Sequence, residues 1–149
     1  MRAGSKHAQE GMTLIEVLVA LLILTGGLLG AAAVQLNALK YTDSSRMTSQ
    51  ASFIAYDMMD RIRANSGADY TVTPPTTGNL SVARDQDLYD FTSNIVNFGG
   101  PTATGSITLN QRVYTITINW DDSRAANSAN SRRSFVLTSR ATVDPVATP

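Results

Sequence analysis

Hydrophobic and polar positions divide the chain into two unequal parts. From residue 17 to residue 39 no residue is charged and most are apolar, whereas the rest of the chain is rich in Ser, Thr, Asn and Asp. A helix over this stretch would be about 34 Å long at ~1.5 Å per residue, enough for a hydrocarbon core of ~30 Å. The pattern therefore predicts one membrane-spanning helix.

The helical period continues beyond the uncharged stretch. Apolar residues recur at intervals of three or four, which is typical of an amphipathic helix: Met47, Ala51, Ile54, Met58 and Ile62. Asp57 precedes Arg61 by four positions, the favoured order for an ion pair along a helix. Asn65-Ser66-Gly67 predicts the helix end. We expect one long helix whose second half lays an apolar stripe against a globular domain.

The remainder of the chain predicts a small α+β head. A Thr-, Pro- and Gly-rich stretch over 70–82 is typical of a loop, and 85–97 predicts a short helix that ends at 98–101. Three segments predict strands, two of them by their alternation: 106–109, 113–120 and 135–143, with 110–112 turning the first hairpin. An antiparallel sheet with one apolar face needs a cover, and the stripe up to Ile62 provides one.

The composition of the chain excludes most kinds of catalytic and metal-binding site. Basic and acidic residues balance at 12 each, there is no cysteine, and His7 is the only histidine. Disulfides, cysteine-ligated zinc and thiol catalysis are therefore excluded, and the neutral charge gives no reason to expect nucleic-acid binding. We expect no enzyme activity, no cofactor and no metal site.

The segment 121–133 is long and polar and predicts an exposed loop. Asp121-Asp122 fits no known calcium loop and is interpreted as a capped turn after a strand, and Arg132-Arg133 as a solvated loop end. Sheet-end loops often carry contacts, so this one is a hypothetical surface for a partner.

Glu16 is the unexpected residue, because it lies at the border of the apolar run. A carboxylate costs roughly 2.5–3.5 kcal/mol if it is carried to the bilayer centre. One interpretation places it simply among lipid headgroups. In the other it has a positive partner: a cut after Gly11 would give Met12 a free α-amino group four residues before Glu16, on the same helix face.

Three interpretations of the N-terminal part compete. It is an ordinary single-span anchor, a secretory signal peptide with a cleavage site at Ala31-Ala32-Ala33, or a segment cut at its cytoplasmic end that stays in the membrane and later joins an assembly. Arg2 and Lys6 favour a cytoplasmic N-terminus. Three glycines inside the span serve either close helix packing or local unwinding: Gly26, Gly27 and Gly30.

The start GMTLIE followed by VLVALLIL resembles the class III signal of type IV pilins and type II secretion pseudopilins. The resemblance implies that a prepilin peptidase cuts after Gly11 and methylates Met12. It implies that Glu16 pairs with the terminal amine of an adjacent subunit during assembly. Two positions depart from the family pattern: Met12 stands where Phe is commonest, and Glu10 where a basic residue is often found.

A second motif indicates which family of pilin-like proteins the chain resembles. With this start, DMMDRIRAN at 57–65 is similar to the minor pilin family called type IV pilus modification protein, PilV. The resemblance implies the lollipop fold of pilins in three parts: a cleaved leader at 1–11, a long helix at 12–65 with its membrane and assembly half at 12–39, and a head at 66–149. Members often carry cysteines in the head, and this chain has none.

The resemblance also implies a function. A minor pilin would help initiate, modify or decorate type IV pili and so support twitching motility and adhesion. Its partners would be the prepilin peptidase, other minor and major pilins, and a tip adhesin. It would lie in the bacterial inner membrane with a periplasmic head before reaching the pilus. The alternatives are a minor pseudopilin of type II secretion or an anchored periplasmic binding domain.

Overall fold

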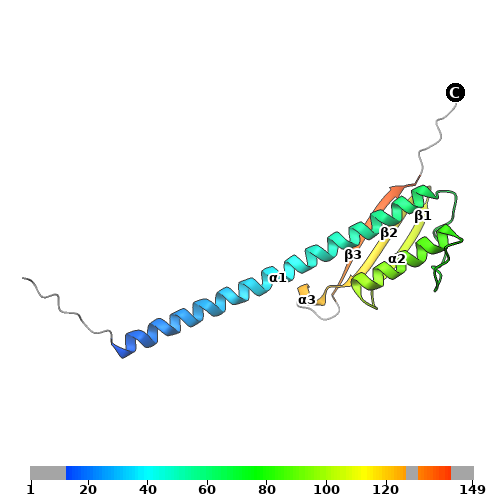
Figure 1. Ribbon diagram of the computed structural model, residues 1–149. Coiled ribbons are helices and arrows are strands. Elements are labelled where there is room, and N and C mark those ends of the chain that lie inside the picture. The colour runs from blue at the N-terminus through cyan, green and yellow to red at the C-terminus, as the bar shows by residue number, and fades with distance from the viewer. Residues whose placement is uncertain (1–12, 127–130, 142–149) are drawn as a thin grey trace, which may run out of the picture. The chain divides into compact units, whose positions relative to one another are not determined.

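One helix of 51 residues, α1, begins at Leu14 and ends at Ala64. The computed structural model describes residues 13–126 and 131–141. The remaining elements follow along the chain in the order drawn in Figure 1: α2 (Ala83–Gly99), β1 (Thr104–Asn110), β2 (Val113–Asp121), α3 (Ser123–Ala126) and β3 (Arg132–Arg140). The predicted α+β class, with a long N-terminal helix and a small antiparallel sheet, is confirmed.

The described chain divides into two compact units between Leu39 and Lys40. The first unit holds the N-terminal part of α1. The second holds the remainder of α1 with every other described element. The division falls where the uncharged stretch of the sequence ends. The described side chains before it are exposed, whereas many of those after it pack into a core.

The three strands form one antiparallel sheet in the order β1-β2-β3. A two-residue turn joins β1 to β2, and both of its residues have positive φ, 46° at Gln111 and 70° at Arg112. This is the hairpin turn whose twist matches that of paired strands. The turn predicted at 110–112 is confirmed.

The core of the second unit lies between the sheet and its two helices. Alternate residues of β2 are buried, and they meet buried residues of α1 and α2: Tyr114, Ile116, Ile118 and Trp120 with Ala51, Ala55, Met58, Met59, Ile62, Leu88, Phe91 and Ile95. The predicted stripe on α1 is confirmed, since Ala51, Met58 and Ile62 are fully buried. Met58 and Met59, which are adjacent in the sequence, both pack in this core.

The prediction for the last strand was wrong at its start and its end. β3 begins at Arg132 rather than at 135 and ends at Arg140, and Arg132 pairs with Asp121 of β2. The polar residues 132–134 extend the strand because they pair with β2. These residues do not alternate between apolar and polar, so the sequence pattern does not predict the extension. Phe135 and Leu137 face the core as predicted, and Val143 lies outside the described residues.

The helix predicted at 85–97 is confirmed and is slightly longer. α2 starts at Ala83 and ends at Gly99, where Gly100 adopts φ 81° and donates its N–H to the carbonyl of Val96 at 2.9 Å. Residues 65–82 form neither helix nor strand, which confirms the loop predicted over 70–82. Their course nevertheless buries one large side chain, Tyr70, completely.

Candidate functional site

Glu16 lies in the first turn of α1. The carbonyl of Thr13 accepts hydrogen bonds from the N–H groups of Glu16 at 3.0 Å and Val17 at 3.3 Å, so the helix is formed from this point. A carboxylate in a first turn interacts favourably with the unpaired N–H groups there. Gly11 and Met12, the predicted cleavage and methylation residues, lie outside the described residues.

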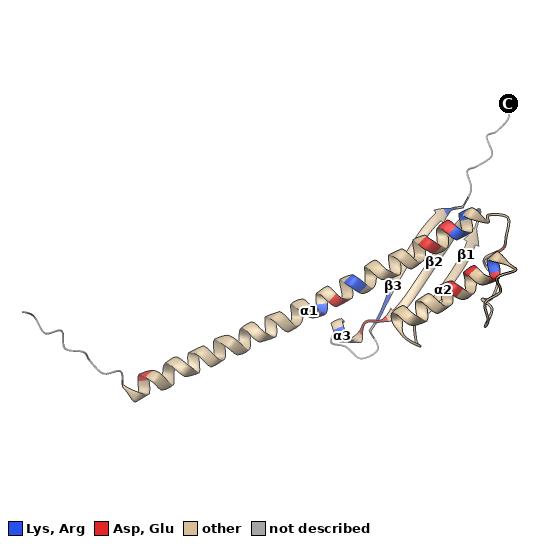
Figure 2. Cartoon of the chain, viewed as in Figure 1, with Lys and Arg blue, Asp and Glu red and all other residues tan. Residues whose placement is uncertain are grey.

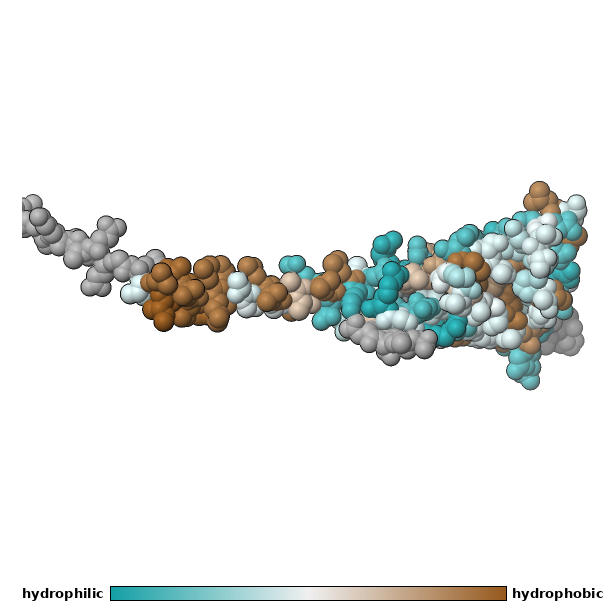
Figure 3. Space-filling model, turned by 90° about the horizontal axis from the view of Figure 1, so that it is seen from below, coloured by the Kyte–Doolittle hydropathy of each residue, from teal (hydrophilic) through white to brown (hydrophobic). Residues whose placement is uncertain are grey.

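The N-terminal part of α1 exposes a largely apolar surface. Its large side chains lie open on every side of the helix: Leu14, Ile15, Val17, Leu18, Val19, Leu21, Leu22, Ile23, Leu24, Leu28, Leu29, Val34, Leu36 and Leu39. Figure 3 shows this surface as a brown band at the start of α1, followed by brown patches that paler and teal residues separate. At about 25 cal/mol per Å², such exposure is strongly unfavourable in water. These side chains therefore require lipid or protein around them.

A single charged side chain lies on the same surface. Figure 2 shows red at the start of α1, followed by a long tan stretch before the next charged side chain. In the sequence these charges are Glu16 and Lys40. Within the described residues, α1 is the one helix long and apolar enough to cross a membrane. Glu16 is thus the only charged side chain on the described part of α1 before Lys40.

The three glycines of the span lie within continuous α-helix. A Cβ built at Gly26, Gly27 or Gly30 would meet no atom within 4 Å. Within residues 13–126 and 131–141, no neighbouring atom therefore requires glycine at these positions. Both interpretations of these glycines, close packing with a neighbouring helix and local unwinding, stay predictions.

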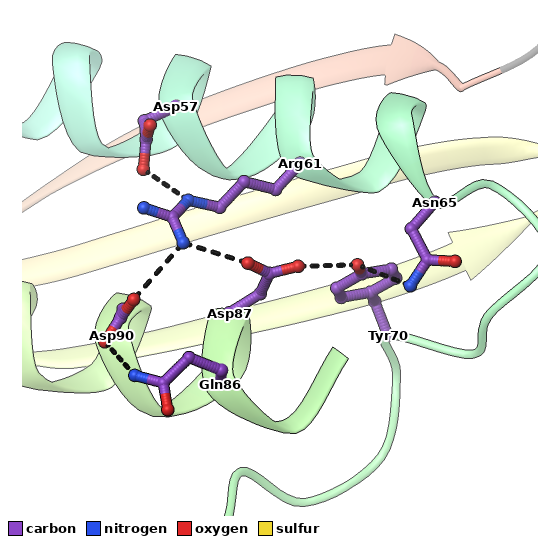
Figure 4. A network of polar contacts seen from close by, with 7 residues as sticks. All are labelled: Asp57, Arg61, Asn65, Tyr70, Gln86, Asp87 and Asp90. Atoms are coloured by element: carbon purple, nitrogen blue, oxygen red, sulfur yellow. Dashed lines mark hydrogen bonds and ion pairs between the residues drawn. The ribbon is translucent and has the colours of Figure 1, made fainter. Parts of the chain in front are cut away.

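In the second unit, Arg61 of α1 bonds three carboxylates, two of which lie on α2. Its Nε donates to Asp57 Oδ2 at 2.9 Å, and its Nη1 donates to Asp87 Oδ1 at 2.9 Å and to Asp90 Oδ2 at 3.2 Å. Figure 4 shows the guanidinium between the two helices. The hydrogen bond to Asp87 is the main reason why the pKa of Arg61 rises above its usual value. The predicted Asp57–Arg61 pair is confirmed.

Tyr70 extends this network into the loop that follows α1. Its hydroxyl donates to Asp87 Oδ2 at 2.8 Å and accepts a hydrogen bond from Asn65 Nδ2 at 3.2 Å (Figure 4). Burial, and then the hydrogen bond to Asp87, raise the pKa of Tyr70 to about 12. The hydroxyl therefore stays protonated and holds the loop against both helices. The Thr- and Pro-rich sequence around Tyr70 gave no signal for this role.

The network explains the chemistry of the DMMDRIRAN segment. Its polar residues Asp57, Arg61 and Asn65 are spaced by four, so they share one face of α1, and that face meets α2 and the loop. The apolar residues between them, Met58 and Ile62, turn toward the sheet and are buried. The segment thus supplies both polar and apolar contacts between α1 and the rest of the second unit.

The predicted loop at 121–133 is replaced by ordered structure over most of its described part. Asp121 ends β2 and accepts the N–H of Ser123 at 2.8 Å, which confirms the capped turn, and α3 follows. Ser44 Oγ donates to Asp122 Oδ2 at 2.9 Å, and Arg133 Nε lies 3.0 Å from the same oxygen.

These contacts correct two expectations. Asp122 is only 8% exposed and Ser44 only 4%, so Asp122 is a structural residue that ties the β2–β3 connection to α1. Arg132 and Arg133 belong to β3, and Arg132 Nη2 donates to the carbonyl of Thr102 at 2.7 Å. Neither arginine is a solvated loop end. Across the described residues, no group of three or more His, Asp or Glu side chains could hold a metal ion.

Comparison with known proteins identifies the N-terminal segment. The family described as the prokaryotic N-terminal methylation motif matches residues 6–32. No curated protein and no solved structure matches the chain. The matched range contains Gly11, Met12, Glu16 and the first two-thirds of the uncharged stretch, and together with the apolar helix it fits membrane anchoring. The chain thus carries a type IV pilin-like prepilin signal, which indicates a pilin-like or pseudopilin-like protein.

Proposed function

We propose that this protein is a minor pilin, a structural subunit without enzyme activity that helps initiate, modify or decorate type IV pili. The observation that carries the proposal is the position of Glu16. It is the one charged side chain on the described apolar part of α1, it lies in the first turn, and it falls within the methylation motif at residues 6–32. A carboxylate placed there is costly in lipid unless a cation meets it.

The cation in this proposal is the amine of a processed subunit. A prepilin peptidase in the inner membrane cuts after Gly11 and methylates Met12. The new terminus pairs with Glu16 of an adjacent subunit as the chain leaves the bilayer. The exposed apolar side chains of α1 then exchange lipid for the helices of neighbouring minor and major pilins, so their burial from water is maintained throughout.

The second unit is the periplasmic head in this proposal, later displayed on the pilus. A family resemblance to PilV, the type IV pilus modification protein, rests on DMMDRIRAN and supports a pilus rather than a type II secretion machine. Roles in twitching motility and adhesion, and contact with a tip adhesin, follow from that resemblance. The β2–β3 connection remains a proposed partner surface.

Two variants of Glu16 test the proposal. Glu16→Ala and Glu16→Gln should both be cleaved and inserted into the inner membrane, but both should be lost from sheared pili, because neither supplies a negative charge. Glu16→Asp, which keeps the charge, is the matched control and should retain part of the incorporation. Equal recovery of all three variants in pili would contradict the assembly role. Normal pili with failed protein secretion in a deletion strain would instead favour the pseudopilin.

A further inference from the structure

β1 is an edge strand without the usual protection of an edge. Its sequence TGSITLN contains no charged residue and no proline, and every residue except Ile107 is exposed. The opposite edge strand, β3, carries Arg132, Arg133 and Arg140. Charged side chains on an edge discourage pairing with another strand, and uncharged edges permit it.

The hairpin geometry shows which backbone groups this edge offers. Asn110 and Val113 close the two-residue turn, and in such hairpins the closing pair is hydrogen-bonded. Because bonded pairs alternate along an antiparallel ladder, the N–H and C=O groups of Gly105, Ile107 and Leu109 point away from β2. Within the described part of the chain, no backbone hydrogen bond joins these groups to another element.

Two hollows lie along the same edge. The first has a volume of about 210 Å³ and is lined by Gly105 and Ile107 of β1, by the loop 70–74, and by Leu88 and Phe91 of α2. The second, of about 600 Å³, runs on past Ile107 to Leu109 and is bordered by residues 66–69. Thr71 and Ile107 line both, so the hollows adjoin, and they follow the three outward-pointing residues.

Charge along the hollows is confined to one place. Asp69 is the single charged side chain that lines either of them. Thr71 donates to Asp69 Oδ1 from its hydroxyl at 2.6 Å and from its N–H at 2.8 Å. These bonds hold the pKa of Asp69 below its usual value, so the carboxylate is ionised at neutral pH. An occupant would therefore be uncharged along β1 and basic at the Asp69 end.

We propose that the free edge of β1 binds an extended segment of another protein, which adds to the sheet as a fourth strand. The segment spans five positions opposite residues 105–109, about 14 Å at ~3.4 Å per residue. It is uncharged, with alternate apolar side chains over the hollows, and it carries a Lys or Arg beside Asp69. Main-chain hydrogen bonds supply the affinity, and the hollows with Asp69 supply the specificity. This binding site does not depend on the proposed assembly role.

The test uses the full chain in detergent micelles and a fluorescent peptide, acetyl-Lys-Val-Thr-Val-Thr-Val-amide. We expect saturable binding by anisotropy and slowed hydrogen exchange at the amides of Gly105, Ile107 and Leu109. Leu109→Pro removes one outward N–H and should weaken binding about tenfold or more. Its matched control is Val136→Pro, because the N–H of Val136 faces the free edge of β3. The two side chains are similarly exposed, Val136 to 54% and Leu109 to 46%. The Val136→Pro variant should bind the peptide normally.

Further variants test the edge and the charge separately. Thr108→Lys places a cation on the β1 edge and should abolish binding, whereas Thr138→Lys, in the same cross-strand row on β3, should not. These two also keep the test valid if Leu109→Pro fails to fold. Asp69→Asn keeps the oxygen that Thr71 bonds and should weaken binding about threefold; Asp60→Asn, another exposed carboxylate, should have no effect.

Three outcomes would overturn the proposal. One is the absence of saturable peptide binding to the folded full chain. Another is equal loss of binding in the β1 and β3 variants of a matched pair. The third is a chain that does not bind the peptide but forms concentration-dependent dimers, which Thr108→Lys abolishes. The occupant of the β1 edge would then be a second copy of this chain.

Discussion

Nη1 of Arg61 on α1 lies 2.9 Å from Oδ1 of Asp87 on α2. This ion pair joins the two helices through residues that are 26 positions apart in the sequence. Asp87 in turn receives the hydroxyl of Tyr70. One carboxylate thus links α1, the loop and α2. The bonds from Arg61 to Asp90 and from Asn65 to Tyr70 join the same three segments.

Substitution of Arg61 by Met should lower the free energy of unfolding of the head by about 1–2 kcal/mol, since three carboxylates lose their common donor. The measurement is urea unfolding followed by circular dichroism of the full chain in detergent. Arg124→Met is the control: Arg124 is 89% exposed and lies 3.8 Å from Asp43, so its loss should change stability by less than about 0.5 kcal/mol. Equal effects of the two variants would contradict the role given to Arg61.

Tyr70 gives the head a dependence on alkaline pH. Its pKa is about 12 in the folded chain against 10.0 for an unperturbed tyrosine, so folding favours the protonated hydroxyl. The resulting stability is fully present below pH 10 and is lost as the pH rises through 12. Tyr70→Phe should cost about 1–2 kcal/mol at pH 8, where Asp87 and Asn65 lose a partner.

The difference between the wild type and Tyr70→Phe should shrink between pH 10 and pH 12, which urea unfolding at pH 8 and pH 11.5 would measure. The subtraction removes the contributions of other tyrosines. A constant difference over this range would show that Tyr70 does not stabilise the head through its protonated hydroxyl.

Gly105 allows α2 to lie close against β1. A Cβ at this position would meet Ile95 Cδ1 and would approach Phe91 Cε1 to 2.8 Å and Cζ to 3.0 Å. Gly105→Ala should therefore destabilise the head by about 1–3 kcal/mol through overpacking. Gly67→Ala is the matched control, because a Cβ at Gly67 meets no atom within 4 Å. The measurement is the thermal unfolding midpoint of each variant. Similar midpoints for Gly105→Ala and Gly67→Ala would contradict the close contact between α2 and β1.

Adjacent serines on α1 provide a test of the buried Asp122 contact. Ser44 Oγ donates to Asp122, whereas Ser45 is exposed and its Oγ donates to the carbonyl of Tyr41 on its own helix at 2.9 Å. Ser44→Ala should cost about 1 kcal/mol because the buried carboxylate keeps only Arg133, and Ser45→Ala should cost little. If both cost the same in urea unfolding, Asp122 does not anchor the β2–β3 connection.

Sequence reasoning was sufficient where the signal is local. The stripe that includes Met58 and Ile62, the Asp57–Arg61 pair and the turn before Val113 each follow from spacing within a few residues, so the helix, the hairpin and the α+β class could be predicted. The motif that contains Gly11 and Glu16 is also local.

The missed features depend on partners far along the chain. Tyr70 lies in a segment without periodicity, and it is buried because it packs into the core, where its hydroxyl reaches Asp87. Asp122 looked like half of an exposed acidic pair, but Ser44, 78 positions away, buries it. Gly105 follows a threonine and precedes a serine, a composition typical of a loop, and only the packing of α2 shows why it is glycine. Such contacts have no pattern in the sequence.

The proposed function requires a cut after Gly11, because this cut creates the amine that pairs with Glu16. The decisive measurement is the mass of the N-terminal peptide of the protein purified from sheared pili. We expect a peptide that begins at N-methylated Met12. A chain that begins at Met1 in functional pili, or one that begins after Ala33, would contradict it.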